Sequence, residues 1–271
     1  MVRAVLALSS SALLAGCALF TDFGGFSSGA EGADASADVA ANETSGELDA
    51  SEPPDADAPE ADTASDASSQ IFVDDFNRAD GVIGNGWVEK TAGSWAISTG
   101  VVVPLVADIN YRRHLLYRPT TEDVLDVEVS VEVTPNQSQP GYPQIFARAR
   151  PLDIANPESY DGYILYVPGN AAEAVITRQR GPETHTPLST FAVNPAINTA
   201  NSYRFVLTVK GTTPVELAGR IERKTLNGFD VIGETKVVDG TGERIGVPGS
   251  VGVSGNGSLK FRYDNFRRTP L

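Results

Sequence analysis

From residue 71 onward, apolar and polar residues alternate along the chain with a period of two. Between Leu125 and Val133 every second residue is apolar, and the residues between them are Asp126, Glu128, Ser130 and Glu132. The same alternation runs from Tyr203 to Val209. Successive side chains of a strand point to opposite faces, so each segment predicts a β-strand with one buried face.

Further strand-like runs fill the remainder of this region, separated by turn sequences such as "TPNQSQPGYP", "VPGN" and "SGNG". No stretch after the first 20 residues sustains the 3.6-residue apolar period of a helix. Strands with one apolar face must bury it against a second sheet, so the pattern predicts an all-β antiparallel sandwich. The runs lie at 95–103, 112–118, 144–150, 160–167, 172–180, 215–223, 229–237 and 259–267.

The order of several segments resembles the concanavalin A-like lectin/glucanase superfamily, including its laminin G-like members. The segments are "FVDDFNRADGVIGNGWVE", "GSWAISTGVVV", "YDGYILYV", "YRFVLTVKG" and "VGVSGNGSLKFRYDNFRR", and together they cover residues 71–271. The resemblance implies a jelly roll of two curved sheets that often binds carbohydrate, with its first and last strands adjacent.

The N-terminus has the features of an export signal. Arg3 precedes a 12-residue apolar stretch, Ala4–Ala15, which is too short to span a bilayer as a helix. The sequence Leu14-Ala15-Gly16-Cys17 resembles the lipobox of bacterial lipoproteins. That resemblance implies a signal peptide over residues 1–17, acylation of Cys17 and attachment to a membrane through the lipid. Ala18 follows the cysteine, which favours attachment to the outer membrane. The sequence does not distinguish the periplasmic face of that membrane from the cell surface.

Residues 18–70 contain Ala, Ser, Asp, Glu, Gly and Pro with almost no large apolar side chain after Phe26. This composition predicts a disordered tether. Thirteen of the chain's 35 acidic residues lie here, with no Lys or Arg, so residues 71–271 carry 20 basic and 22 acidic residues. The predicted domain is therefore nearly neutral, which argues against nucleic acid as a partner.

Carboxylates lie at both ends of the predicted domain. Alternation places Asp74 on the side of Phe76, and Asp264 on the side of Phe266. An inward carboxylate must be paired or bound to a cation. The superfamily resemblance implies a structural Ca²⁺ held by Asp264 with Asp74 or Asp75. Hydrogen bonds to backbone amides, or pairing with nearby arginines, are the alternatives.

Two glutamates are the candidate catalytic residues. Glu128 and Glu132 have the outer spacing of the Glu-x-Asp-x-Glu motif of laminarinase-like glucanases, but Ser130 replaces the central Asp. A retaining mechanism needs two carboxyl groups about 5 to 5.5 Å apart. The sequence therefore favours a non-catalytic domain, with a glycoside hydrolase or lyase as the alternative.

Arginine and tyrosine side chains are the candidate ligand-binding groups. Pyranose faces stack on aromatic rings, and arginines can line a groove for an anionic glycan. The leading prediction is non-catalytic polysaccharide binding at the cell envelope, and a structural or protein-interaction module is the alternative. The candidates are Arg148, Arg150, Tyr160, Tyr166 and Arg178; pairing of the arginines with Glu128 and Glu132 is the competing interpretation.

Overall fold

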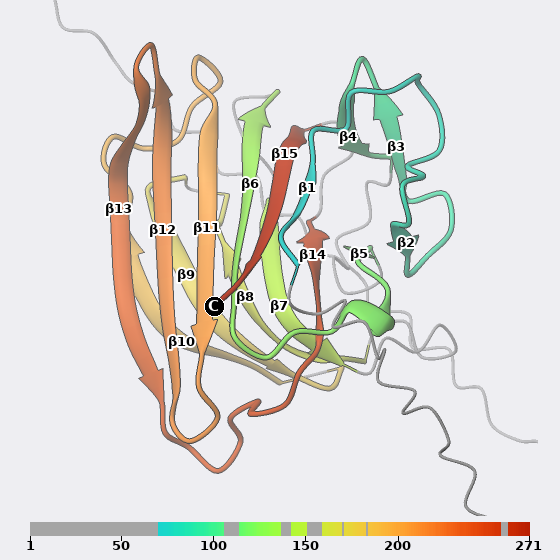
Figure 1. Cartoon of the computed structure of the whole chain (residues 1–271). Coiled ribbons are helices and arrows are strands. Elements are labelled where there is room, and N and C mark those ends of the chain that lie inside the picture. Colours follow the sequence, from blue (N-terminus) through green and yellow to red (C-terminus); the bar gives the residue numbers. More distant parts are fainter. Residues whose placement is uncertain are drawn as a thin grey trace, which may run out of the picture. The chain divides into compact units, whose positions relative to one another are not determined.

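The computed structural model describes residues 70–105, 114–136, 142–150, 159–169, 171–182, 184–255 and 260–271, and Figure 1 shows their arrangement. The predicted signal peptide, Cys17 and all of the predicted tether except Gln70 lie outside these residues. None of the helices in the described ranges has the length and apolar content needed to cross a membrane.

The described residues form fifteen strands and one short 3₁₀ turn, η3 (Thr120–Glu122). The strands are β1 (Phe72–Asp74), β2 (Val88–Glu89), β3 (Trp95–Ser98), β4 (Val101–Pro104), β5 (Leu116–Tyr117), β6 (Val127–Pro135), β7 (Gln144–Arg150), β8 (Asp161–Tyr166), β9 (Glu173–Arg180), β10 (Thr184–Ala192), β11 (Tyr203–Lys210), β12 (Val215–Thr225), β13 (Gly228–Asp239), β14 (Ser250–Ser254) and β15 (Phe261–Pro270).

These strands form two antiparallel sheets. The first sheet has the order β13-β12-β11-β6-β15-β4-β3, with β1 paired to β15, and the second has the order β10-β9-β8-β7-β14-β5-β2. Figure 1 shows β13, β12, β11, β6 and β15 side by side in the first sheet. The predicted all-β antiparallel sandwich is confirmed, and β1 and β15 are adjacent as expected.

The core lies between the two sheets and follows the alternation of the sequence. The apolar residues of β6 from Val127 to Val133 are buried, and they belong to one cluster with Ile145 of β7 and Leu165 of β8. Gly219 of β12 lies where the two sheets approach each other closely: a Cβ there would lie 2.9 Å from Cδ1 of Ile176 in the second sheet. The other side chains of β6 therefore point to the outer face of the first sheet.

The predicted strand over residues 95–103 is wrong, because the chain reverses within it. Thr99 and Gly100 both have positive φ, 54° and 74°, as a two-residue hairpin turn requires, and they separate β3 from β4. Three strands, β2, β10 and β14, were not predicted, and β2 is only two residues long. The edge strand β10 lacks a clean apolar alternation, and β14 is buried at all five residues, so neither shows a period of two.

A β-bulge in β15 changes the faces of its polar residues. Asp264 pairs with Glu132 and Arg267 pairs with Ser130, so two residues of β15 lie opposite one residue of β6. Asn265 in the bulge has a φ of 47°. The prediction that Asp264 and Phe266 share a face is therefore wrong: Phe266 is in the core, whereas Asp264 lies beside Glu132 on the outer face.

Candidate functional site

The carboxylate of Asp74 is buried and accepts hydrogen bonds at both oxygens. Arg78 donates from Nη1 to Oδ1 at 2.8 Å and from Nη2 to Oδ2 at 3.0 Å. The backbone N–H of Phe76, the Asn85 amide and the indole N–H of Trp87 donate at 2.8, 2.9 and 2.8 Å. Burial raises the pKa of Asp74, but these donors outweigh it and lower the pKa to about 2. Asp74 is therefore an ionised structural anchor.

These contacts bear on the predicted calcium site. Asp74 does not fit as a Ca²⁺ ligand, because its oxygens accept five hydrogen bonds and two of these come from the Arg78 guanidinium. Asp75 accepts a hydrogen bond from the backbone of Asn77, and Asp264 accepts one from the backbone of Asn265. In the part of the chain that the structure describes, no three His, Cys, Asp or Glu residues are grouped to hold a metal ion. Calcium binding stays a prediction without a complete set of ligands.

Burial raises the pKa of Asp264, and the negative charges of Glu132 and Asp75 add to that effect, although the backbone N–H of Asn265 opposes it. The surroundings of Asp264 thus disfavour its ionised form.

Arg148 is fully buried and closes one end of the sandwich. Its guanidinium donates to the carbonyls of Leu125, Ile245 and Gly211, each at 2.7 Å, and lies 3.3 Å from Asp126. No part of the side chain reaches the surface, since its exposed fraction is 0%. The predicted ligand-binding role does not fit this burial, and Arg148 is a cross-link between loops and strands.

Arg178 and Arg150 are also held in ion pairs. Nη1 of the buried Arg178 lies 2.8 Å from Asp239, a residue at the end of β13, so the pair joins the two sheets. Arg150 is half exposed and pairs with Asp123. Neither arginine contacts Glu128 or Glu132 as the competing interpretation required, because those glutamates lie on the outer face of the other sheet.

The two predicted aromatic ligands lie on the outer face of the second sheet. Tyr160 is fully buried in a second apolar cluster with Phe146 and Ile164, and Tyr166 packs against that cluster from its edge. The ring of Tyr166 also lies 5.6 Å from the imidazole of His185. Tyr160 therefore cannot stack on a sugar, and only Tyr166 retains exposed surface.

Glu128 and Glu132 share the outer face of the first sheet but do not form a close pair. Residues four apart in a strand are separated by about 13 Å at Cα. The carboxylate of Glu132 lies 2.8 Å from Lys224 Nζ. The strand geometry therefore does not favour the short carboxyl separation of a retaining glycosidase.

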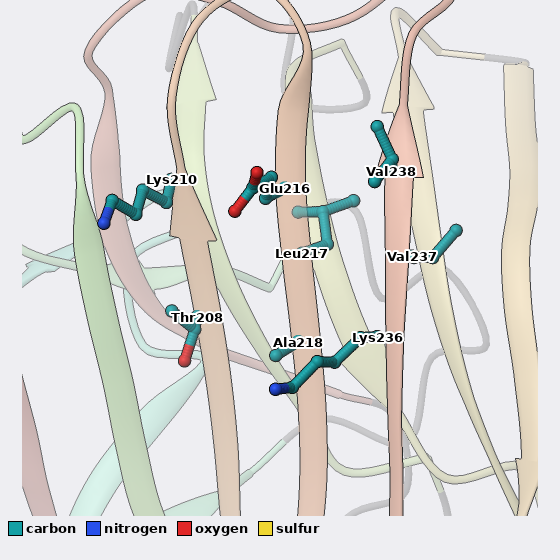
Figure 2. Close-up of a pocket in the computed structure, with 8 residues that line it drawn as sticks. All are labelled: Thr208, Lys210, Glu216, Leu217, Ala218, Lys236, Val237 and Val238. Carbon is teal, nitrogen blue, oxygen red and sulfur yellow. The ribbon is translucent and has the colours of Figure 1, made fainter.

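Two adjoining depressions occupy the outer face of the first sheet. The larger, of about 440 Å³, lies over β11, β12 and β13. Figure 2 shows the Lys236 side chain extending from β13 toward β12 below Ala218, with Thr208 on β11 beyond it. Lys210 and Glu216 add charged groups of both signs to the lining.

The second depression, of about 280 Å³, lies over β15, β6, β11 and β12. It adjoins the first, because Thr208 of the first is the cross-strand partner of Glu128 of the second. We call it the arginine depression. Its lining residues are Glu128, Ser130, Arg204, Val206, Arg220, Arg267 and Thr269.

The carboxylate of Glu222 holds two of these arginines. Nε of Arg204 lies 2.5 Å from one oxygen, and Nε of Arg220 lies 2.6 Å from the other. Only 5% of the Glu222 side chain is exposed, against 36% for Arg204 and 38% for Arg220. The ring of Phe229 lies 4.1 Å from the Arg204 guanidinium and braces it from the side.

Sequence reasoning missed Arg204, Arg220 and Arg267. The signal that exists is their alternation: each follows or precedes a core residue in its strand and so points outward. Their convergence depends on which strands are neighbours and on the bulge at Asn265, and neither is visible in the sequence.

No family model matches the sequence, and no curated protein is significantly similar to it. Several solved structures resemble the chain. A protein of unknown function with a galectin-like fold from Bacillus subtilis is 15% identical, with a TM-score of 0.49 over 73% of this chain and 94% of its own. A carbohydrate-binding module, CBM66, from Bacillus subtilis is 12% identical, with a TM-score of 0.47 over 68% and 95%. A Bacillus licheniformis beta-glucanase is 11% identical, with a TM-score of 0.46 over 74% and 98%.

Proposed function

We propose that the chain is a lipid-anchored envelope protein whose β-sandwich binds polysaccharide without cleaving it. The site is the outer face of the first sheet, across the two adjoining depressions. The tether predicted over residues 18–70 separates this domain from the lipid on Cys17.

The observation that carries the proposal is the pair of adjoining depressions on this face, the larger with a mainly apolar lining and the arginine depression with a mainly polar one. The two depressions lie next to each other across neighbouring strands and offer guanidinium, ammonium, hydroxyl and carboxylate groups. A pyranose ring packs one face on apolar surface while a few polar groups hydrogen-bond its hydroxyls, and the lining of the larger depression offers both kinds of group.

Binding can be tested with a glycan array probed with the chain from residue 18 to residue 271. We expect retention on at least one polysaccharide class. We expect the double variant Thr208→Trp/Ala218→Trp, which fills the larger depression from the outer face, to lose at least about tenfold in affinity. The control is Arg223→Gln, which lies on the other face of β12. Absence of binding to every polysaccharide would remove the proposed function.

Lipid attachment can be tested separately with Cys17→Ser in the full chain. Three acyl chains contribute about 0.8 kcal/mol for each buried CH₂, so the unaltered protein is expected to stay with membranes. Loss of the acylated thiol should move the variant to the soluble envelope fraction, while polysaccharide binding stays the same. Unchanged membrane retention of the variant would contradict the anchoring model.

A further inference from the structure

We propose that the arginine depression recognises the acidic groups of an anionic polysaccharide, as carboxylates or sulfate esters. This inference rests on the proposed function and specifies the substrate class of the same site. Three guanidinium groups, those of Arg204, Arg220 and Arg267, supply the recognition.

The three arginines keep hydrogen-bond donors available for a ligand. Each of the three arginines makes a side-chain hydrogen bond through Nε: Arg204 and Arg220 to Glu222, and Arg267 to the Thr269 hydroxyl at 3.1 Å. None of their Nη atoms donates to any residue that the structure describes. Guanidinium Nη groups pair with carboxylate or sulfate oxygens in short, charge-assisted hydrogen bonds.

The guanidinium groups of Arg204 and Arg220 are fixed before a ligand arrives. Glu222 accepts from both Arg204 and Arg220 while remaining almost fully buried, so the two side chains are held in one arrangement. Fixing donors in advance lowers the entropy lost on binding. Glu222 is therefore a positioning residue, because its oxygens face the arginines rather than the depression.

The floor of the arginine depression is low at its centre and has an arginine on either side. Arg267, Ser130, Val206 and Arg220 are successive cross-strand partners on β15, β6, β11 and β12. The two central residues are small and buried, with exposed fractions of 9% and 3%. The flanking arginines stand three strand spacings apart, about 14 Å at Cα. A sugar ring can rest over the small residues while the arginines reach its acidic group from both sides.

The positive charge that would attract an acidic polymer is concentrated in the arginine depression. The arginine depression has three guanidinium groups against the carboxylates of Glu128 and Glu222. Residues 71–271 as a whole carry 20 basic and 22 acidic residues, so the domain has no general attraction for polyanions. Selective binding of an acidic polymer must therefore come from the depression.

The test compares acidic polysaccharides with their neutral forms, using the chain from residue 18 to residue 271. The panel contains polygalacturonate and its methyl ester, alginate and its propylene glycol ester, and dextran sulfate and dextran. We expect at least one acidic member to bind roughly tenfold or more tightly than its neutral form, as the loss of charge-assisted hydrogen bonds implies. The uronate and sulfate pairs distinguish the two kinds of acidic group.

The other outcomes separate the two proposals. Binding of a neutral form as tightly as its acidic form would overturn the inference and leave polysaccharide binding standing. Binding of neutral glycans on the array, with no acidic member bound, would overturn the inference in the same way. Failure of every acidic and neutral polysaccharide would remove both.

Substitutions of single arginines test whether the acidic polymer binds in the arginine depression. Arg220→Gln and Arg267→Gln are each expected to weaken binding of the acidic polymer by about tenfold. Thermal unfolding should stay nearly unchanged in Arg267→Gln, because the partner of Arg267 is the Thr269 hydroxyl, and Arg220→Gln leaves Glu222 paired with Arg204. Arg223→Gln is the matched control, with the same charge change in β12 but on the opposite face. Equal losses in all three variants would show general electrostatic attraction and would overturn the assignment.

Glu222→Gln provides a test of positioning. The variant makes the domain more positive, so simple charge attraction would tighten binding. We expect several-fold weaker binding instead, because Arg204 and Arg220 lose their shared carboxylate. Tighter binding would overturn the positioning role of Glu222.

Discussion

Replacement of Asp74 by alanine is expected to lower the free energy of unfolding by about 4 kcal/mol, the range found when one partner of a buried ion pair is removed. The variant leaves the Trp87 indole N–H and the Arg78 guanidinium without their shared acceptor. Trp87 also contacts the rings of Phe76 and Phe266, so the loss extends to the junction of the first and last strands.

Chemical denaturation at neutral pH measures this effect. Asp75→Ala is the control, because the exposed Asp75 makes one hydrogen bond to the Asn77 backbone. We expect the control to lose less than about 1 kcal/mol. Equal losses in the two variants would contradict the anchoring role of Asp74.

The lowered pKa of Asp74 also gives a pH dependence of known sign. The folded state has a pKa of about 2 against 3.8 for the unfolded chain, so the ionised form stabilises the fold above pH 3.8. This contribution, about 2 kcal/mol, is lost as the pH falls from 3.8 toward 2. Asp74→Asn cannot titrate and should lack this part of the acid dependence.

Replacement of Arg148 by methionine is expected to cost about 4 kcal/mol, because it leaves a buried polar network without its donor. Three carbonyl oxygens, of Leu125, Ile245 and Gly211, would each lose a 2.7 Å hydrogen bond. Methionine has a similar length but offers no donor.

The measurement is again the free energy of unfolding, with Arg223→Met as the control. Arg223 is partly exposed and lies 3.8 Å from the exposed Asp230, so its loss should cost under about 1 kcal/mol. A stability loss at Arg148 no larger than at Arg223 would show that the carbonyls find other donors. Polysaccharide affinity should be unchanged in both variants, because neither residue lines a depression.

Alternation predicted the strands that bury one face. The segments 144–150, 172–180 and 203–209 agree with β7, β9 and β11 to within one residue. The strand β14 was not predicted, because it lies inside its sheet with all five residues buried and its sequence therefore has no alternation. The edge strand β10 was not predicted for the opposite reason, since few of its side chains are buried.

Site residues were harder to predict than strands. Alternation indicates that an arginine points away from the core, but it does not indicate which other residues lie beside that arginine on the outer face. Arg148 has a positive φ of 54°, and its side chain turns into the end of the sandwich. Arg204 and Arg267 both point outward. They lie near each other because β11 and β15 are both neighbours of β6 in the sheet. Strand order decides which arginines converge, and strand order is a property of the whole fold.

The pairing of β1 with β15 has a mechanical consequence. Arg267, which lines the arginine depression, is the cross-strand partner of Val73, three residues after Gln70. The Arg268 guanidinium also donates to the Gln70 carbonyl at 3.2 Å. If the chain is anchored through residues before Gln70, tension between that anchor and the part of a polymer held at Arg267 would pass directly through the pair of β1 and β15.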